Sequence, residues 1–209
     1  MKILGIETAT RFVSVAVIDE TRLIAEYRVS LDMRQAERLL PLIDTMLKEA
    51  QVSLSDLNAI AVSIGPGSFT SLRVGLSTAK GLAIGRGLPL VPIPTLEAMV
   101  MPFRHSKRSI VPVIVSRKNE IYWAMFSQDG VRLRPDSVSS MEEMLEIIGH
   151  EDIFFVGEDA PLALQSPLAS SVAQLGLARL MNGETCLAED VIPAYLHELS
   201  PNKIPGKSL

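Results

Sequence analysis

The order of predicted secondary-structure elements repeats within this chain, and that repeat is the strongest constraint on its fold. β-Branched and alternating runs predict strands near residues 2–6, 12–18 and 23–29, joined by tight connections typical of an antiparallel meander. A helix over 34–50, an apolar strand over 58–64 and a helix over 71–84 follow. The first hundred residues therefore have the order β-β-β-α-β-α.

The second half shows the same order more faintly. The predicted elements are strands over 110–115, 120–126 and 131–133, a helix over 140–148, a strand over 153–157 and a helix over 170–181. Ser140 and Glu143 have capping-box spacing at the start of the first of these helices. A self-similar order at half the chain length predicts two related α/β domains, 1–103 and 104–196, followed by a flexible tail over 197–209.

The composition limits the classes of protein to consider. The chain has 209 residues, of which 47% are hydrophobic and 21% charged, which excludes a largely disordered protein. No apolar run reaches the roughly 18 residues of a membrane helix, and the amino terminus lacks the apolar stretch of a signal peptide, so we expect a cytoplasmic protein. The formal net charge of −4 weighs against strong autonomous binding to nucleic acid, while a local basic patch stays open.

Metal and thiol chemistry find little support in the sequence. His105, His150 and His197 are isolated, and no His-Glu-x-x-His motif is present, so we predict no metal site. The single cysteine, Cys186, excludes a disulfide within the chain and lies in a polar stretch with no nearby histidine. We predict no catalytic role for its thiol.

The segment from Gly65 to Arg73 is the most distinctive in the chain. It follows an apolar strand and opens a helix, a place where backbone N–H groups gather and an anion can bind. No Gly-Lys-Ser/Thr is present, so this is not a Walker loop. The alternative, which the residues favour, is a tight glycine turn in which Ser68 or Thr70 caps the helix.

Two helices have more apolar or small residues than one core-facing stripe requires. Gly75, Ala79 and Ala83 recur every four residues in the second helix, which predicts a tightly packed face. The first helix is apolar at Leu39, Leu40, Leu42, Ile43, Met46 and Leu47. The pattern fits an intersubunit helical bundle and a deep internal core equally well.

Several motifs of this chain resemble the bacterial TsaB family, also called YeaZ. They are Ile3-Leu4-Gly5-Ile6-Glu7-Thr8-Ala9-Thr10, the loop Gly65-Pro66-Gly67-Ser68-Phe69-Thr70-Ser71-Leu72-Arg73-Val74-Gly75, Glu37-Arg38-Leu39-Leu40-Pro41-Leu42-Ile43 and Pro94-Thr95-Leu96-Glu97-Ala98. The resemblance covers the first hundred residues well and the rest weakly. It implies an α/β actin/Hsp70-like (ASKHA) fold of two related domains.

The resemblance also implies a function. The chain would be a non-catalytic scaffold subunit in the threonylcarbamoylation of tRNA adenosine next to the anticodon (t6A). It would pair with a catalytic TsaD-like subunit, be joined by a TsaE-like ATPase, meet tRNA only through the complex, and form a homodimer when alone. ATP and threonylcarbamoyl-adenylate would be used by the partner subunits, with no cofactor bound tightly by this chain.

The same resemblance assigns two groups of residues. The expected partner interface consists of Leu39, Leu40, Ile43, Met46, Leu47, Leu72, Gly75, Leu76, Ala79 and Ala83. The expected degenerate phosphate-type loops contain Glu7, Thr8, Thr10, Gly65, Gly67, Ser68, Thr70 and Arg73. A second phosphate-type turn, Ser116-Arg117-Lys118-Asn119-Glu120, lacks glycine and aspartate, which disfavours close backbone approach to phosphate and Mg²⁺ binding.

The chain departs from the family pattern at several positions. Glu7 stands where aspartate is usual, Ser71 replaces glycine, Gln35-Ala36 replaces His-Ser, Ser116-Arg117-Lys118 replaces an Asp-Ala-Arg-like stretch, and His197 replaces arginine. The alternative functions are a stand-alone actin-like ATPase or kinase and, with less support, a glycoprotease-like peptidase, which the absence of a paired-histidine motif disfavours.

Overall fold

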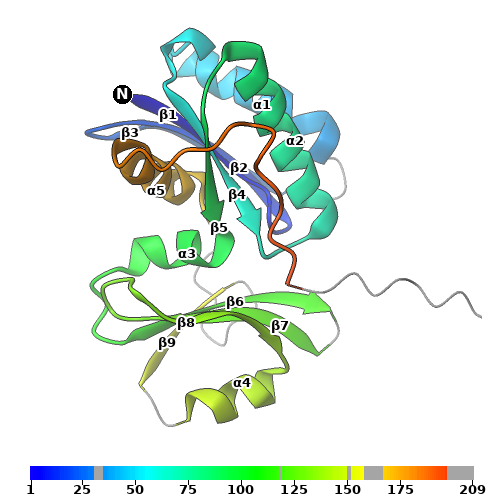
Figure 1. Ribbon diagram of the computed structural model, residues 1–209, viewed down its shortest axis with the longest axis vertical. Coiled ribbons are helices and arrows are strands. Elements are labelled where there is room, and N and C mark those ends of the chain that lie inside the picture. The colour runs from blue at the N-terminus through cyan, green and yellow to red at the C-terminus, as the bar shows by residue number, and fades with distance from the viewer. Residues whose placement is uncertain (31–34, 118, 150–151, 158–166, 197–209) are drawn as a thin grey trace, which may run out of the picture.

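The first sheet is built from five strands in the order β3-β2-β1-β4-β5. In this computed structural model, which describes residues 1–30, 35–117, 119–149, 152–157 and 167–196, the strands are β1 (Lys2–Glu7), β2 (Phe12–Asp19), β3 (Leu23–Ser30), β4 (Ala59–Gly65) and β5 (Leu90–Pro94). The first three form the predicted antiparallel meander, whereas β4 and β5 run parallel to β1 (Figure 1).

Helices cover both faces of this sheet. One face packs against α1 (Gln35–Glu49) and α2 (Phe69–Arg86), and the other against α3 (Thr95–Val100) and α5 (Ala169–Met181). The αL residue Gly87 ends α2, which therefore extends two residues beyond the predicted helix end at 84. Two 3₁₀ turns, Leu54–Asp56 and Met101–Phe103, complete the first half. A buried layer of aliphatic side chains therefore lies on each side of the sheet.

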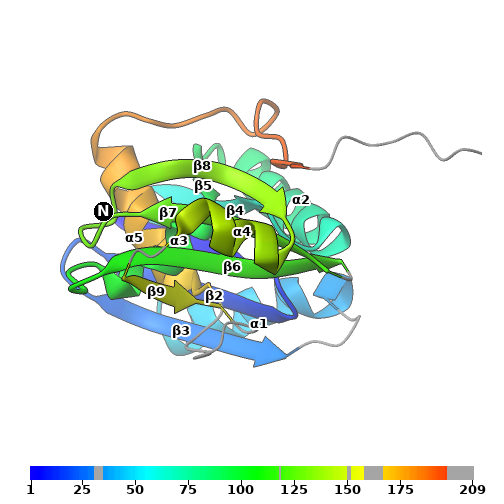
Figure 2. The ribbon, with the colours of Figure 1, turned by 90° about the horizontal axis from the view of Figure 1, so that it is seen from below.

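The second sheet has four strands in the order β8-β7-β6-β9. They are β6 (Ser109–Arg117), β7 (Glu120–Phe126), β8 (Arg132–Ser139) and β9 (Ile153–Val156). One face packs against α4 (Met141–Ile148), and the other against α3 (Figure 2). Ser140 caps α4 and Glu143 completes the predicted capping box.

The repeat is present, but the two halves differ. The first half continues past the predicted order with β5 and α3, which the pattern analysis missed, and the second sheet has four strands within the described ranges. The helices also cross over: α3 of the first half contacts β6 and β7, while α5 of the second half packs on the first sheet. The domain limits 1–103, 104–196 and 197–209 stay a prediction, and the last segment lies outside the described residues.

The packing of α5 on the first sheet is fixed at both ends. The Ser14 hydroxyl accepts the Ala169 N–H at 2.9 Å, and the Glu26 carboxylate accepts both the N–H and the hydroxyl of Ser170. At the other end the Arg179 guanidinium donates to the Pro92 carbonyl and to Glu97, each at 2.7 Å. These contacts hold the two halves of the chain together.

The segment after α5 returns along the first half as a strap, defined here as residues 184–196. Its Cys186 exchanges backbone hydrogen bonds with Leu90 on the edge strand β5, and Val191 is buried in the core beneath α2. Figures 1 and 2 both show the strap running alongside α2 toward the loop that joins β4 to α2. None of the helices described is long and apolar enough to cross a membrane.

Candidate functional site

The site begins where β1 ends, at a carboxyl group that the fold buries. Glu7 is 1% exposed and its Oε1 accepts the Ala9 N–H, while Oε2 has no hydrogen-bond partner among the residues that the structure describes. The Ser63 hydroxyl accepts the Thr8 N–H at 3.5 Å. Burial raises the pKa of Glu7 to about 7, and the hydrogen bond from the Ala9 N–H partly opposes this rise. The carboxyl therefore keeps its proton at a pH where an exposed glutamate has lost it.

The loop between β4 and α2 packs directly onto the β1–β2 loop. The Ser68 N–H donates to the Ala9 carbonyl at 2.7 Å, and a Cβ added to Gly67 would lie 2.7 Å from the Cβ of Ala9. Gly65 precedes a cis peptide bond to Pro66, has φ of +118°, and lies against the Ala194 carbonyl of the strap. The Ser68 N–H and the space beside Gly65 and Gly67 are thus occupied by the chain itself.

Helix α2 closes the site from the other side. Gly75 lies so close to Thr8 that an added Cβ would stand 3.1 Å from the threonine methyl and closer still to its hydroxyl oxygen. Thr8 is fully buried, and within the described part of the chain its hydroxyl has no hydrogen-bond partner. The tightly packed small-residue face that we expected on this helix is therefore packed within the chain at Gly75.

The capping prediction for α2 is only partly correct. Ser68 is the N-cap residue, but its side chain accepts no backbone N–H; instead it accepts the Ser71 hydroxyl at 2.9 Å. Thr70 lies exposed in the first turn, and the Thr10 hydroxyl accepts the Phe12 N–H at 3.3 Å in the neighbouring loop. The fold thus brings together the predicted loop residues Glu7, Thr8, Gly65, Gly67 and Ser68.

Arg73, the last predicted loop residue, lies apart from these buried groups. Its guanidinium stacks 3.7 Å from the centre of the Phe69 ring, and its Nε donates to the Tyr195 hydroxyl at 3.1 Å. The two rings lie 4.8 Å apart. Both views place the β6–β7 turn on the same side of the molecule as this end of α2 (Figures 1 and 2); its Lys118 is outside the described residues.

The structure corrects the list of residues predicted to contact a partner. Nine of the ten are buried in the interior of this chain, namely Leu39, Ile43, Met46, Leu47, Leu72, Gly75, Leu76, Ala79 and Ala83. Only Leu40 of that set is exposed, at 52%. Their apolar stripe faces the sheet, as the internal-core alternative predicted, so any contact of α1 and α2 with another subunit would use the outer faces of these helices.

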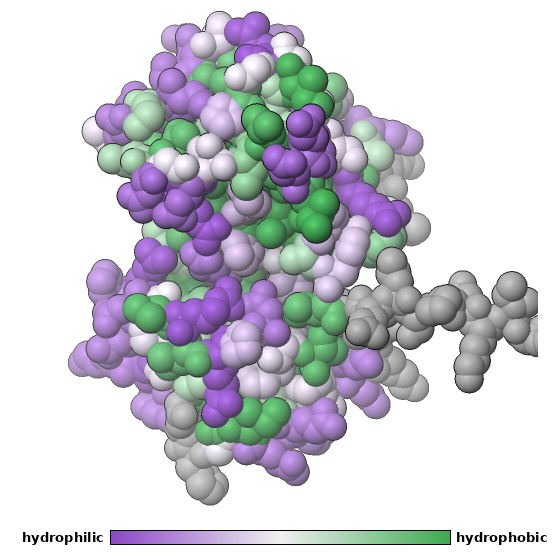
Figure 3. Space-filling model, viewed as in Figure 1, coloured by the Kyte–Doolittle hydropathy of each residue, from purple (hydrophilic) through white to green (hydrophobic). Residues whose placement is uncertain are grey.

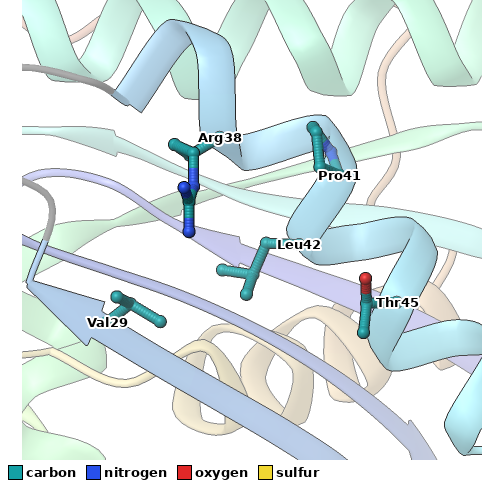
Figure 4. A pocket seen from close by; sticks show the side chains of 5 residues that line it. All are labelled: Val29, Arg38, Pro41, Leu42 and Thr45. Atoms are coloured by element: carbon teal, nitrogen blue, oxygen red, sulfur yellow. The ribbon is translucent and has the colours of Figure 1, made fainter.

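The outer face of α1 borders a shallow hollow of about 460 Å³ (Figure 4). The residues that line it are Arg38, Pro41, Leu42 and Thr45 from the helix and Val29 from the edge strand β3.

On α2 the most exposed apolar side chain is Ile84, at 71%. In the space-filling view, hydrophobic and hydrophilic side chains are mixed over the face shown, and a waist separates the upper and lower parts of the molecule (Figure 3).

The sequence analysis did not foresee the strap. Its residues are polar or follow no period, and Arg73 and Tyr195 are 122 residues apart in sequence. Among histidines, His105 is exposed beside Asp129, whereas His150 and His197 lie outside the described residues. No group of three or more His, Cys, Asp or Glu side chains within the described ranges is placed to hold a metal ion.

Comparison with known proteins shows which family the sequence of this chain resembles. Residues 32–189 match the family model described as "TsaD: tRNA N6-adenosine threonylcarbamoyltransferase". The tRNA threonylcarbamoyladenosine biosynthesis protein TsaB of Escherichia coli is 29% identical over 99% of this chain and 100% of that protein. The protein of the same name from Bacillus subtilis is 29% identical over 79% of this chain and 74% of its own length.

A solved structure shows the same architecture. YeaZ from Pseudomonas aeruginosa superposes with a TM-score of 0.80 and 27% identity, covering 93% of this chain and 99% of that one. Together with the two mixed sheets and the family match, this confirms the α/β actin-like (ASKHA) fold predicted above.

Proposed function

The chain belongs to the TsaB (YeaZ) family, within the wider group that the TsaD family model describes, and from this premise we propose that it is a non-catalytic subunit for t6A formation on tRNA. In this proposal its partner is a TsaD-like catalytic subunit, and a TsaE-like ATPase joins the assembly. The relatives that match nearly the whole chain are named for tRNA threonylcarbamoyladenosine biosynthesis, and these names support a role of this chain in t6A formation.

The observation on which the non-catalytic role rests is the closure of the loops at the ends of β1 and β4. An actin-like ATPase uses such loops to surround phosphates, for which their backbone N–H groups must be available. Here the Ser68 N–H is bonded to Ala9, the Ala9 N–H to Glu7, and Gly75 lies against Thr8. A nucleotide would have to displace these contacts before it could bind.

The electrostatics of the same loops support this role. The pKa of about 7 leaves much of the Glu7 carboxyl protonated at neutral pH, which weakens it as a ligand for Mg²⁺. ATP and threonylcarbamoyl-adenylate are then used by the partner subunits, and this chain binds no cofactor tightly.

The partner surface that we propose is the outer face of α1 and α2. Leu40 on α1 and Ile84 on α2 are the large apolar side chains that these helices leave most exposed. Burying such side chains against another helix would stabilise an assembly, and the same surface would let the chain form a homodimer when its partner is missing.

Two measurements test this proposal. Depletion of the chain from its host should lower the t6A content of tRNA, measured by nucleoside mass spectrometry, and re-expression should restore it. Calorimetric titration of the isolated chain with ATP and Mg²⁺ should give no binding at micromolar concentrations. A normal t6A content of tRNA without the chain would contradict its role in t6A formation. Tight ATP binding would instead favour the stand-alone ATPase.

A further inference from the structure

An arginine on the surface of this chain is held by two aromatic residues. Arg73 lies over Phe69 at 3.7 Å from the ring centre, and Tyr195 both stacks on Phe69 and accepts the Nε–H of Arg73. Phe69 is 39% exposed and Tyr195 37% exposed, and Arg73 is exposed as well. The cluster is therefore a preformed surface feature, whose side chains lose little rotamer freedom when a ligand binds.

The remaining donors of this arginine are available to a ligand. Only Nε is engaged by Tyr195, and Arg73 has no acidic partner in the part of the chain that the structure describes. Between Asp56 and Glu97 the sequence contains no Asp or Glu at all, while Arg73, Lys80 and Arg86 are its basic residues. Although the net charge of the chain is −4, every charged residue on helix α2 is basic.

The strap is also held by contacts that do not involve this arginine. The Ala194 N–H donates to the Ile64 carbonyl at 2.7 Å, and Val191 is 3% exposed in the core. The Phe69–Tyr195 stack adds a contact at the end of the strap. A purely structural role therefore leaves the unpaired positive charge of Arg73 without an explanation.

A planar guanidinium whose two Nη groups are free recognises paired anionic oxygens, and half-exposed aromatic rings beside it can stack on an unpaired base. A carboxylate on a partner protein would use the arginine and leave the rings aside, whereas a single-stranded nucleotide would use both. Beside the neighbouring loop, joined through the Ser68–Ala9 bond, the guanidinium groups of Arg28 and Arg11 lie 4.2 Å and 5.1 Å from the centre of the Phe12 ring. The chemistry of the surface therefore favours RNA.

We propose that Arg73, with Phe69 and Tyr195, contacts the tRNA directly within the assembly: the guanidinium binds a backbone phosphate, and the rings stack on an unpaired nucleotide. This inference rests on the proposed function, since it takes the tRNA to be the substrate of the complex. It adds to that function a substrate-binding surface on a subunit otherwise regarded as a scaffold.

The test is a titration of fluorescently labelled substrate tRNA with the purified complex of this chain and its catalytic partner, repeated over a series of KCl concentrations. Arg73→Gln should weaken binding about tenfold. It should also lower the slope of log affinity against log salt by about one, the signature of a lost phosphate contact. Arg73→Lys should keep the slope and lose part of the affinity. Arg86→Gln, at the other end of α2, removes the same charge and should change neither.

The outcomes separate the two proposals. If Arg73→Gln and Arg86→Gln give the same affinity and slope as the unsubstituted complex, the RNA contact is wrong. If Arg73→Gln releases the catalytic subunit during purification, Arg73 binds protein instead, and the inference is also wrong. If the unsubstituted chain forms no complex, the proposed function fails, and the same titration of the isolated chain then decides the RNA contact by itself.

Discussion

Gly75 of helix α2 packs against Thr8 at the end of β1, with no room for a Cβ between them. Thr8 is 0% exposed, so neither residue can move into solvent to relieve an added atom. This contact joins a helix whose outer face we assign to partner binding to the end of β1, where we propose that the loops are closed to nucleotide.

Alanine substitutions on α2 should therefore have opposite effects at two glycines. Gly75→Ala should lower the free energy of unfolding by about 1 to 3 kcal/mol, because its methyl group overpacks against Thr8. Gly81→Ala should raise it by about 1 kcal/mol, since a Cβ at Gly81 meets nothing within 4 Å and alanine is the better helix former. Urea denaturation followed by circular dichroism measures both; equal effects at the two positions would contradict the packing.

The buried carboxyl of Glu7 predicts a pH-dependent stability. Its pKa rises from 4.5 to about 7 on folding, so the folded chain retains a proton that the unfolded chain loses. The resulting stabilisation is complete below pH 4.5 and is lost as the pH rises through 7, a change of about 3 kcal/mol. Glu7→Gln should remove this dependence and make the chain more stable than the unsubstituted one at pH 8.

The control for that experiment is Glu37→Gln, an exposed carboxyl on α1. Urea midpoints at pH 5 and pH 8 are compared for the three chains. A Glu7→Gln variant whose stability falls between pH 5 and pH 8 as much as that of the unsubstituted chain would show that another group titrates.

The ion pair between α5 and α3 should contribute more than an exposed pair of the same type. Arg179 and Glu97 have side chains 26% and 20% exposed, and Arg179 also donates to the Pro92 carbonyl. Arg179→Met should cost about 2 kcal/mol, because it leaves a half-buried carboxylate and a carbonyl without their donor. Arg108→Met removes a pair with Asp152 that is 52% and 75% exposed, and should cost less than about 1 kcal/mol. Thermal unfolding of the two variants tests the difference.

Two substitutions on helix α1, three positions apart, should distinguish an effect on partner binding from an effect on folding. Leu40→Glu, at a side chain 52% exposed, should leave the chain folded and weaken its association with the catalytic subunit. Ile43→Glu, at a side chain 1% exposed, should unfold the chain because it places a charge in the core. Leu145→Glu on α4, where the side chain is 47% exposed, is the matched control and should affect neither property. Association is measured by pull-down, and folding by circular dichroism.

Much of the fold could be predicted because local pattern and tertiary structure agree. The meander, β4, the two long helices and the cap at Ser140 follow from periodicity and turn residues. The strand β5 was missed because it is five residues long and includes Pro92 and Pro94, which are typical of turns rather than strands.

The sequence could not show what the apolar face of a helix packs against. The periodicity of α1 gives a stripe through Leu39 and Ile43, but a stripe is the same whether it meets a sheet of its own chain or another subunit. The burial of Glu7 and the pairing of Arg73 with Tyr195 depend on segments distant in sequence, so no local signal could have found them.

The central claim is that this chain works as a partner of a TsaD-like catalytic subunit. Its most direct test is co-expression of an affinity-tagged chain with the catalytic subunit from the same organism, followed by purification and mass determination of the eluted complex. The account predicts that the two chains elute together in a fixed ratio and separate when Leu40 is replaced by glutamate. Elution of the tagged chain alone, at concentrations where both chains are folded, would contradict it.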